Sequence, residues 1–461
     1  MDNYSFLNTA HTSYFEEQYD RYLKAPDTVE PSWRAFFQGF DFGIERGTNI
    51  LENEEVPESV RKEFQVIKLI DGYRTRGHLF TKTNPVRERR KYSPTLDIEN
   101  FGLSESDLDT IFNAGSIMGI GPTSLKNIIV HLKKVYCDAI GIEYMYIRDP
   151  KKLSWIQERL NINVNSPNFS PDEKKHILNK LNQAVSFENF LHTKYVGQKR
   201  FSLEGGESLI PALDSLILAA DDLGVEEFVM GMAHRGRLNT LANIFGKSTK
   251  DIFSEFDGKD YDEDVFDGDV KYHMGWTSKI DPNKDGKKIN ISLAPNPSHL
   301  ETVGAVVQGI ARAKLENKYL SDTSKVLPII VHGDAAIAGQ GLAYEIVQMA
   351  ALKGYSTGGT VHIIVNNQIG FTTNYLDARS STYCTDVGKV TLSPVMHVNA
   401  DDVEAVVHTV LFALNYRMKF KSDVFIDLLG YRKYGHNEGD EPRFTQPKPV
   451  SYTHLRAHET S

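Results

Sequence analysis

Residues 326–336 read Val326-Leu327-Pro328-Ile329-Ile330-Val331-His332-Gly333-Asp334-Ala335-Ala336, an apolar run that ends in a carboxylate and two small residues. A second apolar run, 361–365, leads into Asn366-Asn367-Gln368-Ile369-Gly370, and a helix-like stretch lies between the two runs. Asp334 and Asn367 are 33 residues apart, about the length of one β-α-β unit. Such a unit places the ends of two parallel strands side by side, where open α/β sheets bind ligands.

Oxygen ligands at these two strand ends predict a site for a divalent cation that also holds phosphates. The Asp334 carboxylate, the Asn367 amide oxygen and the backbone carbonyl of Ile369 suit Mg2+, which prefers hard oxygen ligands. Ala335 and Ala336 are small, so that backbone N–H groups there can approach a diphosphate. The alternative is a strand-end turn followed by a polar loop that binds nothing.

From about residue 190 onward, strand-like and helix-like segments alternate along the chain. The strand candidates are 227–230, 289–293, 326–331, 361–365 and 424–429. The helix candidates are 300–315, 341–353 and 400–420. Gly339-Gln340-Gly341 is expected to open a helix whose positive end faces the cation site, and Asn399, Asp401 and Asp402 suit the start of the last helix. This alternation predicts an α/β fold, a doubly wound parallel sheet over residues 190–449.

Three segments are expected before this domain: an acidic arm at 1–44, a linker at 45–58 and a helical domain at 59–189. The arm carries two amphipathic patterns, one from Phe15 to Leu23 and one from Trp33 to Phe40. These stripes pack either on the same chain or on a partner subunit, in which case the arm is a docking segment. In the helical domain, His78 is interpreted as structural.

Composition excludes several classes of protein. With 52 basic and 61 acidic residues the net charge is −9, and residues 1–60 alone carry −8, which argues against nucleic-acid binding and favours a basic partner for the arm. No apolar run reaches the roughly 18 residues of a membrane span, and no signal peptide is seen. Two cysteines form no disulfide framework. A cytoplasmic location is therefore expected.

Histidines and one serine near other strand ends are further candidates for the site. His234 and Arg235 follow the first predicted strand, and His273 lies in a second Gly-flanked segment. Imidazoles and a guanidinium suit binding carboxylates and moving protons, although single histidines are often structural. Ser298 and Glu301 match a helix capping box, and the same serine could also face an anion.

Several longer segments of the chain match a known family in order. They are Tyr22-Leu23-Lys24, Pro31-Ser32-Trp33-Arg34-Ala35-Phe36-Phe37, Tyr73-Arg74-Thr75-Arg76-Gly77-His78, Lys199-Arg200-Phe201-Ser202-Leu203-Glu204-Gly205, Ala233-His234-Arg235-Gly236-Arg237-Leu238-Asn239, Asn296-Pro297-Ser298-His299-Leu300-Glu301 and Gly435-His436-Asn437-Glu438. With the motifs at Asp334 and Asn367, they resemble the E1 component of the 2-oxoglutarate dehydrogenase complex, from residue 13 to about 447. The resemblance implies thiamine diphosphate and Mg2+ as cofactors and the thiamine-diphosphate-binding fold, of which this chain would carry the diphosphate-binding half.

The resemblance also implies a role for each candidate residue. Asp334, Asn367 and Ile369 would bind Mg2+. Arg235, Ser298, Leu300, Ala335 and Ala336 would line the cofactor, whereas His234, His273 and Ser298 would face the substrate, with the two histidines catalytic. The implied reaction is oxidative decarboxylation of 2-oxoglutarate in the tricarboxylic acid cycle, with succinyl transfer to the lipoyl group of the E2 dihydrolipoyl succinyltransferase. The implied assembly is a homodimer without nucleic acid or membrane.

Two features depart from the family pattern. Thiamine enzymes need an activating glutamate, which this family carries in a domain C-terminal to every segment quoted above. Residues 450–461 also resemble translated adapter sequence, and a non-native tail is expected there. We therefore expect a C-terminally truncated chain that binds cofactor weakly and does not turn over alone. The alternatives are an E1 enzyme for another 2-oxo acid such as 2-oxoadipate, or a non-catalytic scaffold subunit.

Overall fold

A computed structural model describes residues 12–30, 33–34, 36–38, 57–86, 91–257 and 270–446. The predicted linker up to residue 56 and the predicted tail at 450–461 lie outside these residues. The chain divides into two compact units, residues 1–77 with 92–134 and residues 78–91 with 135–461. Each unit is described by itself.

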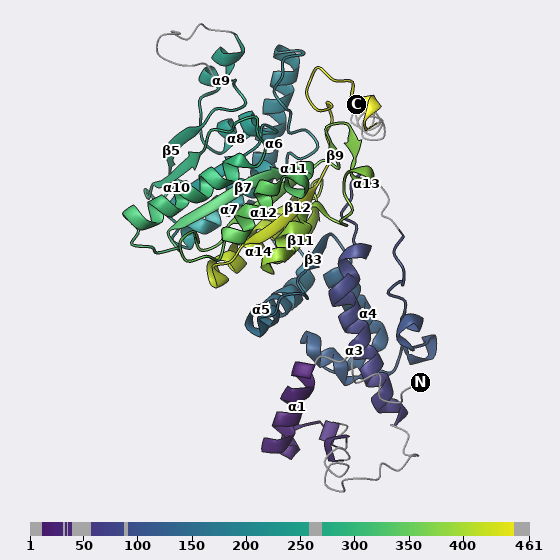
Figure 1. Cartoon of the computed structure of the whole chain (residues 1–461). Helices are drawn as coiled ribbons and strands as arrows, with labels where there is room; N and C mark the ends of the chain where they lie inside the picture. The colour runs from purple at the N-terminus through teal and green to yellow at the C-terminus, as the bar shows by residue number, and fades with distance from the viewer. Residues whose placement is uncertain are drawn as a thin grey trace. The chain divides into compact units, whose positions relative to one another are not determined.

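The larger unit is built on an eight-stranded sheet in the order β3-β11-β12-β8-β7-β4-β6-β5 (Figure 1). The strands are β3 (Ile140–Glu143), β4 (Glu227–Met232), β5 (Trp276–Ile280), β6 (Ile289–Leu293), β7 (Val326–Gly333), β8 (Val361–Asn366), β11 (Val395–Asn399) and β12 (Val424–Leu429). The six central strands run parallel, and the edge strands β3 and β5 run antiparallel to their neighbours. The predicted fold class is thereby confirmed.

Burial explains which strands the sequence reveals. The central strands β4, β8 and β12 are buried along their whole length and are mostly apolar, with Glu227, His362 and Asp427 as buried exceptions. All five predicted strands are present, but β3, β5 and β11 were not predicted. Alternate residues of the edge strand β5 are exposed, and its sequence Trp-Thr-Ser-Lys-Ile is polar at its centre. β11 contains the buried His397, which interrupts its apolar pattern.

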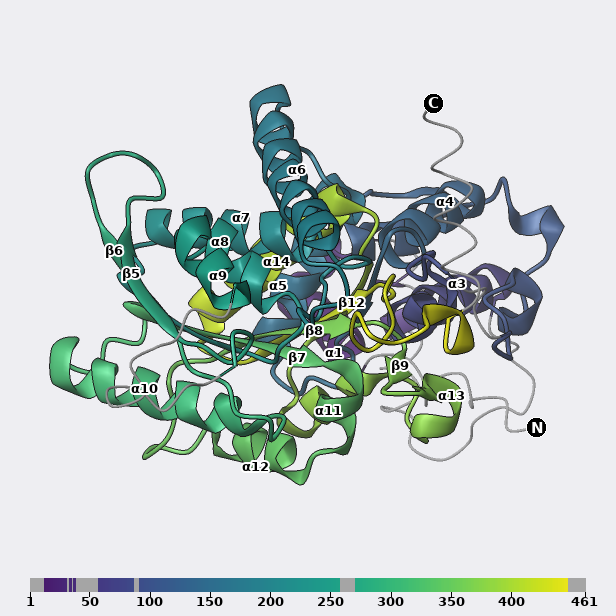
Figure 2. The same cartoon turned by 90° about the horizontal axis from the view of Figure 1, so that it is seen from above.

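Helices cover both faces of this sheet (Figure 2). On one face lie α6 (Pro171–Lys194), α7 (Leu209–Asp222), α8 (Arg237–Asn243) and α14 (Val403–Phe420), and on the other α10 (Thr302–Lys318), α11 (Asp334–Gly339) and α12 (Gly341–Met349). Val303, Val307 and Ala311 of α10 pack against Val229 and Ile330 of the sheet. The remaining helices and short strands of this unit are α5 (Pro150–Asn161), α9 (Thr249–Phe256), α13 (Tyr375–Ala378), β9 (Ile369–Gly370) and β10 (Thr373–Asn374).

One helix start differs from the prediction, and one helix was not predicted. The expected capping box of Ser298 and Glu301 is wrong, because α10 begins at Thr302 and Glu301 is its N-cap residue with φ 72°. The Glu301 carboxylate instead lies 2.5 Å from His332 Nδ1. The helix predicted to open at Gly341 is present as α12, but an additional short helix, α11, precedes it and begins at Asp334 itself.

The smaller unit is mainly helical, with α1 (Thr12–Lys24), α3 (Glu58–Arg76), most of α4 (Leu125–Tyr136) and the two-residue strands β1 (Ile111–Phe112) and β2 (Thr123–Ser124). Residues of the arm form an aromatic cluster, Tyr19, Tyr22, Trp33, Phe36 and Phe37. The rings of Trp33 and Phe36 lie 5.7 and 6.2 Å from the ring of Phe64 in α3. At least part of the amphipathic stripe therefore packs on the same chain.

The boundary between the units differs from the predicted one at 189. Residues 135–189 were assigned to the helical domain, yet they belong to the unit that carries the sheet. Their strand β3 pairs with β11 and forms an edge of the sheet. A strand of only four residues among helices is too short for its sequence pattern to distinguish it from a loop.

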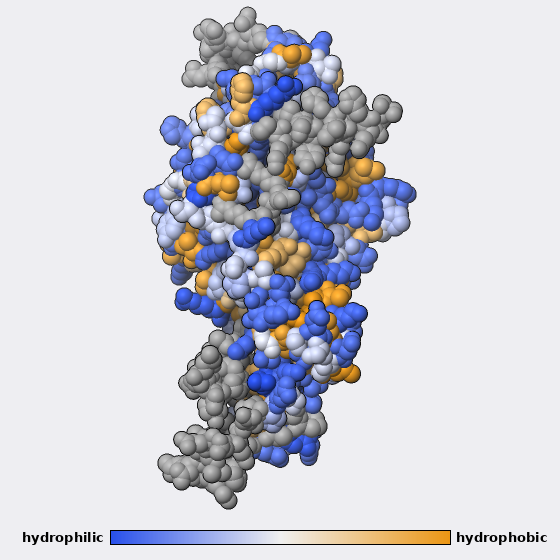
Figure 3. Space-filling model, turned by 90° about the vertical axis from the view of Figure 1, so that its right-hand side faces the viewer, coloured by the Kyte–Doolittle hydropathy of each residue, from blue (hydrophilic) through white to orange (hydrophobic). Residues whose placement is uncertain are grey.

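On the face drawn in Figure 3, the apolar side chains of the described residues lie in small groups among hydrophilic ones. Among the residues that the structure describes, no helix combines the length and the apolar character needed to cross a bilayer.

Candidate active site

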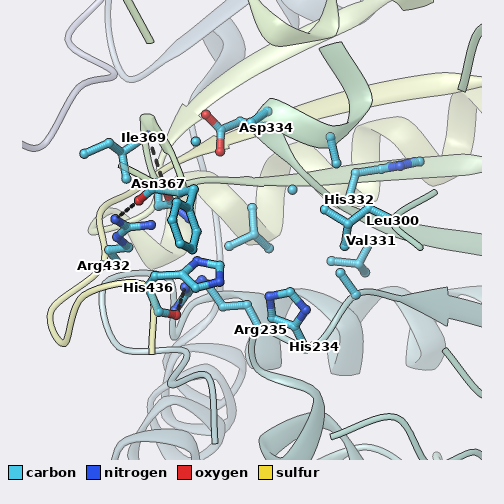
Figure 4. Close-up of a pocket in the computed structure, with 17 residues that line it drawn as sticks. His234, Arg235, Leu300, Val331, His332, Asp334, Asn367, Ile369, Arg432 and His436 are labelled. Carbon is cyan, nitrogen blue, oxygen red and sulfur yellow. Dashed lines mark hydrogen bonds between the residues drawn. The ribbon is translucent and has the colours of Figure 1, made fainter. Parts of the chain in front are cut away.

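A pocket lies at the carboxyl ends of the parallel strands β4, β7 and β8 (Figure 4). This is where open α/β sheets bind ligands. Its lining residues are Ala233, His234, Arg235, Leu300, Val331, His332, Gly333, Asp334, Ala335, Ala336, Val365, Asn367, Ile369, Gly370, Phe371, Arg432 and His436. Eight of the ten predicted site residues are among them.

Asp334 is the buried carboxylate of this pocket. It begins α11 directly after β7 and is 3% exposed. Burial raises the pKa of Asp334 to about 7, and the Arg379 guanidinium, with Nη1 3.8 Å from Asp334 Oδ2, opposes this shift only in part. A carboxylate that is so poorly compensated favours a bound cation, since a divalent ion would replace the lost hydration.

The loop after β8 presents the other two predicted oxygen ligands. Asn367 and Ile369 both line the pocket, and Figure 4 shows them beside the labelled Asp334. The Asn367 amide oxygen accepts a hydrogen bond of 3.3 Å from the Ile369 N–H, and it keeps a second lone pair for a cation. A carboxylate, an amide oxygen and a backbone carbonyl are the donor set of a Mg2+ site.

Buried hydrogen bonds hold this loop in place. The last residue of β8, Asn366, donates from Nδ2 to Asp427 Oδ1 at 2.8 Å and accepts from the Gln368 N–H at 2.9 Å. Gln446 Nε2 donates to the Asn367 carbonyl at 2.7 Å. The side chains around the loop therefore fix its backbone, which is what a preorganised ligand set requires.

Small residues form the wall beside these ligands. Ala335 and Ala336 line the pocket, and a Cβ added to Gly370 would lie 2.8 Å from the Ala335 Cβ. Two backbone segments thus approach each other so closely that a larger residue at 370 would not fit. The oxygen ligands of the pocket fit a divalent cation, and such a cation suits a diphosphate.

Two arginines give the pocket a positive charge. Arg235 donates from Nη1 to the Ser202 carbonyl at 2.9 Å and from Nη2 to the His436 carbonyl at 2.8 Å. Arg432 donates to the Phe371 carbonyl, and burial lowers its pKa to about 10, so that it stays charged at neutral pH. Two guanidinium groups beside one pocket suit an anionic ligand.

The pocket also contains two imidazoles, His234 and His436. Burial, together with the neighbouring Arg235, lowers the pKa of His234 to about 3, and burial lowers that of His436 as well. Both rings are therefore neutral at pH 7. A neutral imidazole can donate one hydrogen bond and accept another, which suits contact with a carbonyl or proton transfer rather than binding a carboxylate by charge.

Arg432 and His436 were not predicted as site residues. They follow β12, the strand next to β8, so the apolar run at 424–429 was the available signal. His436 lies in one of the matched segments, yet no role was assigned to it. His332 also lines the pocket and had been quoted only as part of the strand.

Two predicted residues, His273 and Ser298, do not line this pocket. His273 is 8% exposed and its N–H donates to the Val270 carbonyl at 2.8 Å. It is nonetheless one of the neighbouring groups that lower the pKa of His234, which indicates that the two residues are near each other. Ser298 is exposed in the segment that precedes α10.

Comparison with known proteins assigns the chain to a family. The family model for the dehydrogenase E1 component matches residues 179–461, and the model for the 2-oxoglutarate dehydrogenase N-terminus matches residues 4–43. Three similar proteins are each named 2-oxoglutarate dehydrogenase E1 component. The protein from Cupriavidus necator is 45% identical over 96% of this chain, that from Azotobacter vinelandii is 42% identical over 97%, and that from Brucella canis is 40% identical over 99%.

These matches cover 49%, 50% and 52% of the three relatives, so the chain spans about half their length. The larger family match covers more than half of the chain and includes every strand end that forms the pocket. Membership supports thiamine diphosphate as the cofactor. The chain belongs to the dehydrogenase E1 component family.

Proposed function

We propose that this chain forms the Mg2+- and diphosphate-binding half of a 2-oxoglutarate dehydrogenase (succinyl-transferring) active site. The observation that carries the proposal is the buried Asp334, which meets the oxygen ligands of the loop after β8 in one pocket. The names of the three relatives favour 2-oxoglutarate over 2-oxoadipate or another 2-oxo acid.

One group of pocket residues would bind the cofactor and its cation. Asp334, Asn367 and the Ile369 carbonyl would hold Mg2+, and the backbone at Ala335 and Ala336 would contact the diphosphate. Thiamine diphosphate, when bound, supplies the carbon nucleophile and accepts the electrons released by decarboxylation.

Substrate recognition would fall to the charged and imidazole groups. Arg432 stays cationic and can pair with a substrate carboxylate, whereas the neutral His234 and His436 can exchange protons or hydrogen bonds with a keto oxygen. We extend the substrate role to His273 and Ser298 only as predictions, because they do not line the pocket. Arg235 would act mainly by position, since it follows β4 and its two bonds tie that segment to the carbonyls of Ser202 and His436.

The proposed partners follow from the family and from the arm. The match of residues 4–43 to the 2-oxoglutarate dehydrogenase N-terminus supports docking of this arm on the E2 dihydrolipoyl succinyltransferase. A homodimer, with the activating glutamate on a second domain, completes the proposed assembly. The cytoplasmic location inferred from the sequence stays a prediction.

Calorimetric titration of the purified chain with thiamine diphosphate tests the site directly. We expect binding that requires Mg2+ and is abolished when a chelator removes it. A control titration with thiamine lacking the diphosphate should give no heat. Binding that is unchanged by chelation would contradict the assignment of Asp334 and Asn367.

Decarboxylation tests the activity separately from binding. The chain alone is expected to release no steady carbon dioxide from 2-oxoglutarate. Co-expression with the C-terminal half of the Cupriavidus necator relative should restore carbon dioxide release. The reconstituted protein should have a higher kcat/KM for 2-oxoglutarate than for 2-oxoadipate. If binding occurs but neither substrate reacts in the reconstituted protein, a non-catalytic subunit becomes the better interpretation.

A further inference from the structure

A second cluster of ligand-type side chains lies outside the pocket, at the β3 edge of the sheet. His78, Glu143 of β3 and His397 of β11 are each less than 9% exposed, and one ligand atom from each lies within 4.8 Å of the other two. His397 Nε2 is 3.0 Å from Glu143 Oε1, and His78 Nε2 is 3.6 Å from Glu143 Oε2. The sequence had suggested only a structural role for His78.

In both imidazoles the Nδ1 atom makes a hydrogen bond that orients the Nε2 atom toward the Glu143 carboxylate. His397 Nδ1 lies 2.9 Å from Asp427 Oδ2, and His78 Nδ1 lies 2.9 Å from the Tyr383 hydroxyl. Metal-binding histidines nearly always use their second ring nitrogen in this way, because the outer bond fixes the tautomer and the orientation of the ring. Both rings of the cluster have that arrangement.

The chemistry of these ligands selects the class of metal. Two imidazole nitrogens and one carboxylate are the set that holds Zn2+ in many three-ligand sites, with water in the fourth position. Mg2+ and Ca2+ prefer oxygen ligands throughout and do not suit two imidazoles. The cluster therefore differs in kind from the oxygen ligands around Asp334.

A lysine provides the competing explanation. Lys389 Nζ lies 2.6 Å from Glu143 Oε2, so the cluster is also a buried ion-pair network that needs no metal. The same ammonium lies 2.7 Å from Asp386 Oδ1, and the Lys389 side chain is 32% exposed. Lys389 can thus leave Glu143 and keep one carboxylate partner, while the Glu143 carboxylate gains a divalent cation.

We propose that His78, Glu143 and His397 form a binding site for Zn2+ or a chemically similar transition-metal cation, with Lys389 displaced toward Asp386. Asp427 and Tyr383 orient the two imidazoles. The site is separate from the thiamine diphosphate pocket, since none of its three ligands lines that pocket.

The test uses Co2+ as a visible probe for Zn2+ on the purified chain, freed of metals and kept in excess Mg2+ to exclude the Asp334 region. We expect one Co2+ per chain with the strong visible absorption of a tetrahedral nitrogen and oxygen site, without a thiolate band, and loss of that absorption when Zn2+ is added. Glu143→Gln should weaken Zn2+ binding at least tenfold, whereas Asp334→Ala should leave it unchanged.

Lys389→Met distinguishes the two explanations even if Glu143→Gln fails to fold. Removal of the competing ammonium should tighten Zn2+ binding severalfold, a gain that a damaged protein does not produce. Lys353→Met is the matched control at an exposed lysine and should have no effect. A chain that retains no Co2+ or Zn2+, or a Lys389→Met variant with unchanged or weaker affinity, would overturn the proposal in favour of an ion-pair network.

Discussion

At the scale of single residues, Asp334 shows how binding and stability oppose each other. Its side chain is buried, and Arg379, whose Nη1 lies 3.8 Å from Asp334 Oδ2, compensates only in part for the lost hydration. Such a group destabilises the metal-free fold when it is ionised. The same burial makes it a strong ligand for a divalent cation, because the interaction is screened little by water.

Replacing Asp334 by alanine should therefore abolish cofactor binding without unfolding the chain. We expect Asp334→Ala to weaken Mg2+-dependent binding of thiamine diphosphate at least 100-fold, as measured by calorimetry. Asp109→Ala, which removes an exposed carboxylate in the other unit, is the control and should bind as the wild type does. Retained binding in Asp334→Ala would show that another residue holds the cation.

The stability of the metal-free chain should depend on pH through the same residue. The pKa of Asp334 is raised from 3.8 to about 7 in the folded chain, so the unfolded state loses this proton first as pH rises. Below about pH 4, Asp334 therefore does not change the free energy of unfolding. Between about pH 4 and about 7 it lowers this free energy progressively, and above that window the loss reaches at most about 4 kcal/mol.

Comparison of Asp334→Asn with the wild type isolates this contribution. In the presence of a chelator, the variant should unfold at higher temperature than the wild type at pH 8, and the difference should shrink as pH falls toward 4. Scanning calorimetry at several pH values provides the measurement. A difference that is constant with pH would mean that Asp334 keeps an ordinary pKa.

At the scale of elements, the segments that follow the strands are held by close backbone contacts. Gly205 has φ +98°, and a Cβ placed on it would lie 2.2 Å from the Tyr431 carbonyl oxygen. The Tyr431 N–H donates to the Gly205 carbonyl at 3.1 Å. Because Arg432 is the next residue, this contact helps to determine where its guanidinium enters the pocket.

Gly205→Ala should consequently destabilise the chain and weaken cofactor binding together. Backbone strain of about 1 kcal/mol and a steric clash of about 1–3 kcal/mol are expected to add. Gly197→Ala is the matched control, because Gly197 has φ +71° but open space around its Cβ position, so that only the strain remains. Urea unfolding of both variants separates the two terms, and equal losses would rule out the clash.

At the scale of the whole molecule, the arm and the pocket belong to different compact units. Part of the arm packs through Trp33 and Phe36 on Phe64 of α3. The pocket is lined by residues of the larger unit alone. Partner docking and cofactor binding should therefore be separable by deletion.

Deletion of residues 1–44 should abolish binding to the E2 dihydrolipoyl succinyltransferase and leave thiamine diphosphate affinity within about twofold. The unfolding temperature of the smaller unit should fall, because Phe64 loses its aromatic neighbours. Sedimentation of the chain with purified E2 measures the first effect and calorimetry the second. Wild-type affinity for E2 after the deletion would assign docking to another surface.

The sequence by itself determined the central strands and most of the pocket. The runs at 326–331 and 361–365 are mostly apolar because their strands are buried on both faces, with His362 as an exception, so each can be recognised without knowing its neighbours. The spacing of Asp334 and Asn367 follows from one β-α-β unit, a local construction. Both facts depend on short-range pattern, which a sequence expresses directly.

Only the tertiary structure decided how distant segments meet. β3 and β11 form one edge although about 250 residues separate them, and this pairing brings Glu143 and His397 into the cluster that includes His78. Arg432 and His436 reach the pocket because β12 lies beside β8. Glu301 pairs with His332 rather than completing a capping box. Such contacts depend on which elements pack together, and local periodicity carries no information about that choice.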